Sequence, residues 1–114
     1  MKISHKKSGT ILGSDIKLAA GFFERLIGLM FVKEMRGMDG LFIENSNSIH
    51  NCFVRFPIDV VFLNRELKVI KIIRNFKPWR FSWIYWRASR VLELPVHTIP
   101  ESMEAGDYLE VINV

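Results

Sequence analysis

The sequence predicts a mainly β domain, a small barrel or sandwich, with one amphipathic helix and one short helix. Short apolar runs recur along the chain, and most of them are bounded by Gly, Pro, Asn or Asp, which is typical of strands joined by turns. Only one longer segment changes to a helical period. With 114 residues, 49% of them hydrophobic, the chain is expected to form a single domain, residues 1–114, with a buried core.

The N-terminal third contains the predicted change from strand to helix. Residues 3–18 alternate loosely between apolar and polar, and Gly9 and residues 13–15 punctuate them, so short strands are expected. Residues 19–30 then carry apolar side chains at the i, i+4 and i+7 positions of a helix. These side chains are Phe22, Leu26 and Leu29. We therefore predict an amphipathic helix over 19–30 that packs on a sheet.

The middle of the chain predicts a β-hairpin. Residues 37–40 form a Gly-Met-Asp-Gly turn before a strand that begins at Leu41. Residues 58–63 form an unbroken apolar strand, and residues 67–73 are expected to pair back onto it. Lys68 and Lys71 are three positions apart, so the alternation slips by one, and a bulge near residues 69–70 would account for the slip.

Two strands and a short helix are predicted towards the C-terminus. Residues 91–94 read as a strand that ends at Pro95, and residues 108–112 read as the last strand. Between them, residues 98–101 have the S/T-x-x-E form of a capping box with Pro in the first turn, so a short helix is expected over 98–104.

The composition indicates the cellular compartment, whereas the distribution of charge along the chain has two interpretations. No apolar run approaches the roughly 20 residues that span a bilayer, and the basic first residues are followed by polar ones, which argues against a signal peptide. A single Cys fits a reducing compartment, so we expect a cytoplasmic protein. The net charge is +4, but residues 65–90 are basic and residues 91–114 are acidic. Either the basic segment meets an anionic partner, or the two segments face each other.

Several motifs together resemble one known family. In chain order they are residues 28–31 (Gly-Leu-Met-Phe), 37–42 (Gly-Met-Asp-Gly-Leu-Phe), 49–50 with 56–63 (Ile-His, then Phe-Pro-Ile-Asp-Val-Val-Phe-Leu), 91–95 (Val-Leu-Glu-Leu-Pro) and 106–107 (Gly-Asp). This ordered set is similar to the prokaryotic domain of unknown function 192 family. The resemblance implies a compact, mostly β domain and no agreed activity. Many members carry Trp-Met-Lys-Asn-Thr where this chain has residues 50–56, so a pocket there would have a different lining.

The polar residues beside the apolar 58–63 strand are the candidate ligand-binding site. They are His50, Asn51, Arg55 and Asp59, with Trp79 and Trp83 as one aromatic wall. A few polar groups beside an apolar cleft are typical of a ligand site. We therefore predict a non-catalytic binding or accessory module whose partner, a small molecule or a protein, is unknown. The oligomeric state also stays open.

The alternative is a hydrolase-type enzyme that uses His50 with Asp59 or Cys52. His50 and Cys52 are two apart and would point the same way on a strand, so a thiol–imidazole pair is conceivable. Equally, Cys52 can be a small apolar filler and His50 can bond a backbone carbonyl. Whether the protein is an enzyme stays open. We predict no metal and no cofactor, because a structural zinc site needs four ligands and the other two His residues lie far away in sequence.

Two further functional hypotheses each have a purely structural alternative. A buried Asp59 can cap backbone N–H groups freed by Pro57 or pair with Arg55, instead of anchoring a ligand. Residues 74–90 mix bases with aromatics, as nucleic-acid and other anionic-partner sites do, although we do not expect nucleic acid. Four of the aromatics alternate at period two and would share one face if extended, and that face can equally be core. They are Trp79, Phe81, Trp83 and Tyr85.

Overall fold

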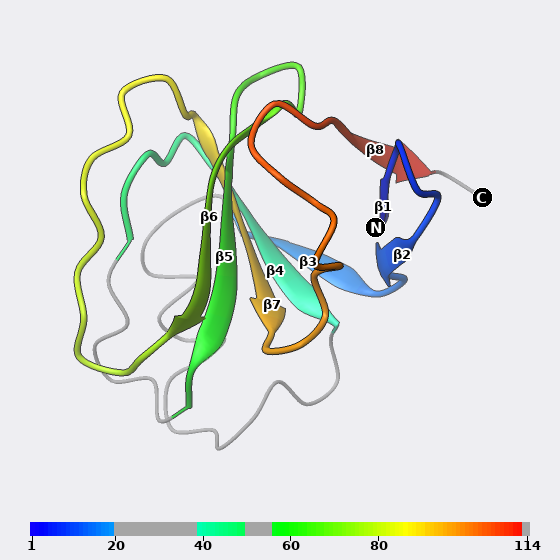
Figure 1. Ribbon diagram of the computed structural model, residues 1–114. Helices are drawn as coiled ribbons and strands as arrows, with labels where there is room; N and C mark the ends of the chain where they lie inside the picture. Colours follow the sequence, from blue (N-terminus) through cyan, green and yellow to red (C-terminus); the bar gives the residue numbers. More distant parts are fainter. Residues whose placement is uncertain (20–38, 50–55, 113–114) are drawn as a thin grey trace.

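The computed structural model describes residues 1–19, 39–49 and 56–112 and confirms that the chain is mainly β (Figure 1). The strands are β1 (Lys2–His5), β2 (Ile11–Gly13), β3 (Ile16–Ala19), β4 (Gly40–Glu44), β5 (Ile58–Leu63), β6 (Val69–Phe76), β7 (Arg90–Pro95) and β8 (Leu109–Ile112). They form a three-stranded sheet of order β2-β1-β8 and a five-stranded sheet of order β3-β4-β7-β5-β6.

The pairing brings distant parts of the chain together. In the smaller sheet the first strand lies antiparallel to the last, so the N-terminal residues lie beside β8 (Figure 1). In the larger sheet β3 and β4 are parallel, whereas every other pair is antiparallel. Consequently the start of β5, the end of β6 and the end of β7 lie side by side at one end of the larger sheet.

Both faces of the larger sheet are buried, which explains the unbroken apolar run in β5. All six residues of β5 are buried. Val61 and Leu63 belong to one core cluster, together with Ile3 of the smaller sheet. Val60 and Phe62 belong to a second cluster on the opposite face. A strand that is apolar on both sides needs no alternation, as its sequence predicts.

The predicted hairpin and its bulge are confirmed. β5 pairs antiparallel with β6, and the register passes from Phe62 opposite Lys71 to Leu63 opposite Val69, which leaves Ile70 as the extra residue. The register shifts again between Ile58 and Val60, near the other end of β6. A bulge changes the direction of the side chains at the point where it occurs. The second bulge lies at the end of the sheet where β5, β6 and β7 meet.

The short helix predicted over 98–104 is wrong. The segment forms turns instead, with the N–H of Met103 donating to the carbonyl of Pro100 at 3.1 Å. The N–H of Glu104, which a helix would direct to that same carbonyl, donates to the carboxylate of Asp107 at 3.1 Å. Two carbonyls of the segment are also bound by Arg74. Local side-chain acceptors and a distant guanidinium thus replace the helical hydrogen bonds.

Two further predictions about the fold concern the barrel and the amphipathic helix. The barrel alternative is wrong, because the described strands form two open sheets, with β3 and β6 as the outer strands of the larger one. The amphipathic helix predicted over 19–30 lies, from residue 20 onward, outside the described residues, and residue 19 ends β3. Within the described ranges no helix is long and apolar enough to cross a membrane.

Candidate functional site

A hollow with several polar side chains in its lining lies where β5, β6 and β7 meet at one end of the larger sheet. Its volume is about 390 Å³. It is lined by Asp59, Arg74, Asn75, Val96, His97, Ile99 and Glu101. Asp59 is the second residue of β5, Arg74 and Asn75 come from the end of β6, and the others follow β7. The strand order of the sheet therefore builds this site from three separate segments of the chain, which lie between residues 59 and 101.

Asp59 is the buried carboxylate of the hollow. Only 2% of it is exposed. Its Oδ1 atom accepts a hydrogen bond from the backbone N–H of Asn75 at 2.8 Å. That N–H lies at the second irregularity of β6, so the carboxylate stabilises the bulge and is itself stabilised, as a buried charge must be. The donor comes from the neighbouring strand, and not from the backbone next to Pro57 as the capping interpretation expected.

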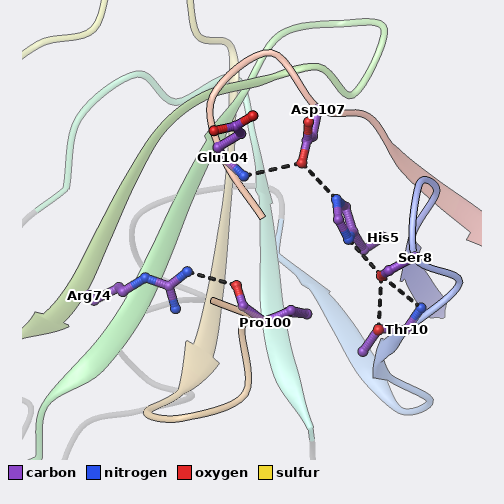
Figure 2. Close-up of polar contacts among 7 residues, drawn as sticks. All are labelled: His5, Ser8, Thr10, Arg74, Pro100, Glu104 and Asp107. Atoms are coloured by element: carbon purple, nitrogen blue, oxygen red, sulfur yellow. Dashed lines mark hydrogen bonds and ion pairs between the residues drawn. The ribbon is translucent and has the colours of Figure 1, made fainter. Parts of the chain in front are cut away.

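Two hydrogen bonds to backbone carbonyls position Arg74 at the side of the hollow. Its Nη1 donates to the carbonyl of Ile99 at 2.9 Å, and its Nη2 donates to the carbonyl of Pro100 at 2.8 Å (Figure 2). Both acceptors are neutral, so the positive charge is anchored but not cancelled. Arg74 and Glu101 also line a neighbouring hollow of about 460 Å³ between β6 and the segment before β8.

Two backbone conformations beside the hollow are unusual. Asn75 has a φ of 56° and His97 a φ of 69°, in the left-handed region that residues other than Gly adopt rarely. Such residues concentrate where a site requires a particular backbone direction. The charged side chains of the lining are two carboxylates and one guanidinium, Asp59 and Glu101 against Arg74. This excess of negative over positive side chains favours a ligand that carries a positive group.

The structure places the predicted site residues in three groups. Asp59 lines the hollow. Trp79 and Trp83 do not; both are exposed on the connection between β6 and β7. The remaining candidates, His50, Asn51 and Arg55, lie outside the described residues, as does Cys52 of the hydrolase alternative. The hollow beside Asp59 thus lacks the two tryptophans, and the role of the other candidates stays a prediction.

Four lining residues were missed by the sequence reasoning: Arg74, Asn75, His97 and Glu101. None belongs to a motif that indicates ligand binding, and Glu101 was interpreted only as part of the capping box at 98–101. The usable signal was positional, because polar residues at the end of β6 and after β7 converge with the start of β5 once the three strands are known to be antiparallel neighbours. That neighbour order requires the β5–β7 pairing, which nothing local in the sequence specifies.

A second polar cluster joins the two ends of the chain. His5 is buried, and its Nε2 lies 2.8 Å from Asp107 Oδ2, while its Nδ1 lies 2.7 Å from Ser8 Oγ (Figure 2). The order Asp-His-Ser is that of a catalytic triad. However, Ser8 Oγ also donates to Thr10 Oγ1 at 2.9 Å, and none of these side chains lines either hollow. We interpret the cluster as a tie between the β1–β2 turn and the turn before β8.

The described residues offer no metal site. No group of three or more His, Cys, Asp or Glu side chains within the described ranges is arranged to hold an ion.

Acid is expected to loosen two ties of the fold. The hydrogen bond from His5, followed by that from the N–H of Glu104, lowers the pKa of Asp107. The N–H groups of Asp15 and Ser14 lower the pKa of Asp39. Because both pKa values are lower in the folded chain, this stabilisation is fully present above about pH 4 and is lost as the pH falls through the folded values.

The measurement is the urea unfolding midpoint between pH 6 and acid, for the wild type and for Asp107→Asn and Asp39→Asn. Each variant should show a shallower acid loss than the wild type, and exposed Glu66→Gln serves as the control. An Asp107→Asn profile parallel to that of the wild type would contradict the role given to this carboxylate.

Comparison with known proteins gives a consistent family. The family model of the domain of unknown function 192 (DUF192), described as "Uncharacterized ACR", matches residues 3–111. A UPF0127 protein of Pyrococcus furiosus is 34% identical over 102 residues, which cover 84% of this chain and 85% of the relative. A UPF0127 protein of Pyrococcus horikoshii is 33% identical over 103 residues, covering 84% and 86%. The resemblance inferred from the motifs is confirmed.

Solved structures share the fold. A protein of unknown function from Novosphingobium aromaticivorans superposes with a TM-score of 0.74 at 20% identity, covering 96% of this chain and 82% of that one. A protein from Sinorhizobium meliloti, provisionally named a transcription regulator, gives the same TM-score at 23% identity, covering 96% and 89%. At these identities the likeness concerns the fold alone.

Proposed function

Because the chain belongs to the domain of unknown function 192 family, whose description assigns no activity, we propose a function from its own geometry: a non-catalytic module that binds a small cationic or zwitterionic molecule in the hollow beside Asp59. The observation that carries the proposal is a carboxylate only 2% exposed that nevertheless lines a hollow of about 390 Å³. A charge is costly to bury, and a ligand with a positive group would use the one that the fold maintains there.

The surroundings of Asp59 support a preformed site. The guanidinium of Arg74 is fixed by two backbone carbonyls, and Asp59 itself is fixed by the N–H of Asn75. A ligand would therefore meet groups that are already oriented, which reduces the entropy lost on binding. With Asp59 as the ammonium acceptor, Arg74 would accommodate a carboxylate on the same ligand, and His97 would lie at the rim.

The enzyme alternative has less support. A hydrolase needs a nucleophile or base that converges with Asp59, and its candidates, His50 and Cys52, lie outside the described residues. The polar groups that do converge include a carboxylate already engaged by a backbone N–H. We also propose a cytoplasmic location, on the ground of the single Cys.

The test compares two substitutions of Asp59. Asp59→Asn keeps an oxygen that can accept the Asn75 N–H but removes the charge, so the fold should be retained while binding of a cation weakens at least about tenfold, in line with the loss of a charge-assisted hydrogen bond. Asp59→Ala removes the acceptor as well and should lower the free energy of unfolding by about 1–2 kcal/mol.

Binding is measured by calorimetry with putrescine, L-lysine and L-arginine as probes and succinate as the anionic comparison. Glu110→Gln on β8, exposed and outside the hollow, is the matched loss of one negative charge. The proposal is overturned if none of the three cationic probes binds the wild type, or if Asp59→Asn binds them as the wild type does.

A further inference from the structure

All three tryptophans of the chain lie on the surface of one connection, residues 77–89 between β6 and β7, which we call the aromatic loop. Its exposed large apolar side chains are Trp79 (61%), Phe81 (75%), Trp83 (83%), Ile84 (49%) and Trp86 (80%). Tryptophan is usually highly buried. Five such side chains lie within eight residues of one loop, and we call them the apolar patch. Such a concentration of exposed apolar side chains is typical of a contact site.

The backbone of the aromatic loop is held in place although these side chains project outward. The N–H of Ser82 donates to the carbonyl of Ile49 at 2.8 Å, and the N–H of Tyr85 donates to that of Asn47 at 2.9 Å. The loop, yellow in Figure 1, accordingly runs beside the segment that follows β4. The Tyr85 ring turns inward onto Phe62, with ring centroids 4.6 Å apart. The single aromatic face predicted for an extended segment is thus not formed, because Tyr85 serves as the anchor.

Three cations accompany the exposed apolar side chains. Lys77, Arg80 and Arg87 are exposed, and none of them forms an ion pair with an acid in the described part of the chain. The acidic C-terminal segment therefore does not neutralise these three residues through direct ion pairs, although Arg87 lines a hollow of about 510 Å³ together with Ala105 and Gly106 of that segment. Their charge is available to an anionic partner.

We propose that the aromatic loop docks on an anionic phospholipid surface, with the tryptophans at the level of the headgroups and the cations on the lipid phosphates. Trp is the side chain most typical of the membrane–water interface, because its ring is apolar and its N–H is polar. Basic residues beside such a patch add attraction to anionic lipids. Neither the hollow beside Asp59 nor its neighbour is lined by the patch.

This partner fits the loop better than single-stranded nucleic acid does. Nucleic-acid platforms combine stacking rings with a charged groove that follows the backbone. Here the apolar side chains project from a loop, and one of them, Ile84, has no ring to stack. Trp79 also has a φ of 63°, in the left-handed region that bulky residues adopt rarely and that is found mostly at functional sites.

The three tryptophans provide the readout, since no other tryptophan contributes emission. The full chain is titrated with vesicles of phosphatidylcholine alone and of phosphatidylcholine mixed with phosphatidylglycerol. We expect a blue shift of the emission and co-sedimentation with the mixed vesicles, and at least about tenfold weaker association with phosphatidylcholine alone, because the three free cations have no anionic surface to meet. High salt should weaken the association with the mixed vesicles.

Two pairs of variants test the residues. The double variant Trp83→Ala/Trp86→Ala should lose most of its association with the mixed vesicles while its thermal midpoint stays unchanged. The control variant Ile11→Ala/Tyr108→Ala, which also removes two exposed apolar side chains, should associate with the vesicles as the wild type does. Lys77→Gln/Arg80→Gln should weaken association about fivefold for each charge. Lys6→Gln/Lys7→Gln, which lowers the net charge equally from the β1–β2 turn, should have a smaller effect.

Three outcomes would overturn the proposal. The first is an unshifted emission spectrum with the mixed vesicles. The second is association that survives the double tryptophan substitution unchanged. The third is binding of an oligothymidylate at a salt concentration at which the mixed vesicles do not bind, which would assign the aromatic loop to single-stranded nucleic acid. Failure of the vesicle experiment leaves the hollow beside Asp59 unaffected, because that site is tested with soluble probes.

Discussion

Replacement of Phe62 by Ala is expected to lower the free energy of unfolding by about 3–5 kcal/mol. Phe62 is a fully buried β5 side chain, and its ring contacts Tyr85 of the aromatic loop at a centroid distance of 4.6 Å. The substitution removes the buried ring and leaves a cavity that a sheet covered on both faces cannot close. Since small domains have a total stability of about 5–15 kcal/mol, the variant is expected to be close to unfolding.

The measurement is urea denaturation followed by circular dichroism. Phe62→Leu, which retains most of the volume but loses the ring, should cost less than about 1.5 kcal/mol. Phe81→Ala is the matched control, because the same side chain is removed from the exposed side of the aromatic loop, and its effect should stay within about 0.5 kcal/mol. Equal losses for Phe62→Ala and Phe81→Ala would show that Phe62 does not anchor this layer of the core.

The sequence predicted those parts of the fold that depend on local order. The 58–63 and 67–73 hairpin is joined by a short turn in which the Asn64 side chain accepts the N–H groups of Glu66 and Lys68. Its bulge at Ile70 was visible as a slip in the spacing of two lysines. An apolar run without alternation correctly indicated a strand buried on both faces. In each case the prediction depended only on residues that are close together in the sequence.

The prediction failed where distant residues decide the outcome. The capping-box pattern at 98–101 is a local helix signal, but Arg74 and Asp107 compete for the polar groups that a helix would need. His5 meets Asp107 across 102 positions, and no spacing rule reports such a contact. The aromatic segment alternates as a strand would, yet Tyr85 turns inward because Phe62 lies beneath it.

The candidate site shows the same division. Asp59 was identified because a carboxylate inside an apolar strand is costly and therefore needs a reason. Arg74 and His97 were not, because a polar residue near the end of a strand is ordinary until the sheet places it beside a buried charge. A charged residue inside an apolar strand can thus be recognised from the sequence alone. The convergence of polar residues from distant segments on one site can be recognised only when the strand order is known.

Replacement of Gly40 by Ala is expected to cost at least about 3 kcal/mol, the upper end of the usual range for overpacking. Gly40 begins β4, and a Cβ atom built on it would lie 2.7 Å from the backbone oxygen of Glu93 and 2.8 Å from Leu94 Cδ2. The leucine side chain can move, but the backbone oxygen belongs to β7, the central strand of the larger sheet. A methyl group would therefore push β4 away from β7, and the hydrogen bonds between them would lengthen.

The free energy of unfolding of Gly40→Ala, measured in urea, is compared with that of Gly106→Ala. At Gly106 a Cβ would meet nothing within 4 Å, and the only penalty is a φ of 97°, so a loss of about 1–2 kcal/mol is expected. Adding Leu94→Val to Gly40→Ala should restore little, because the backbone oxygen of Glu93 remains in place. A full rescue by Leu94→Val would mean that side-chain crowding alone, and not the close approach of β4 and β7, requires glycine at this position.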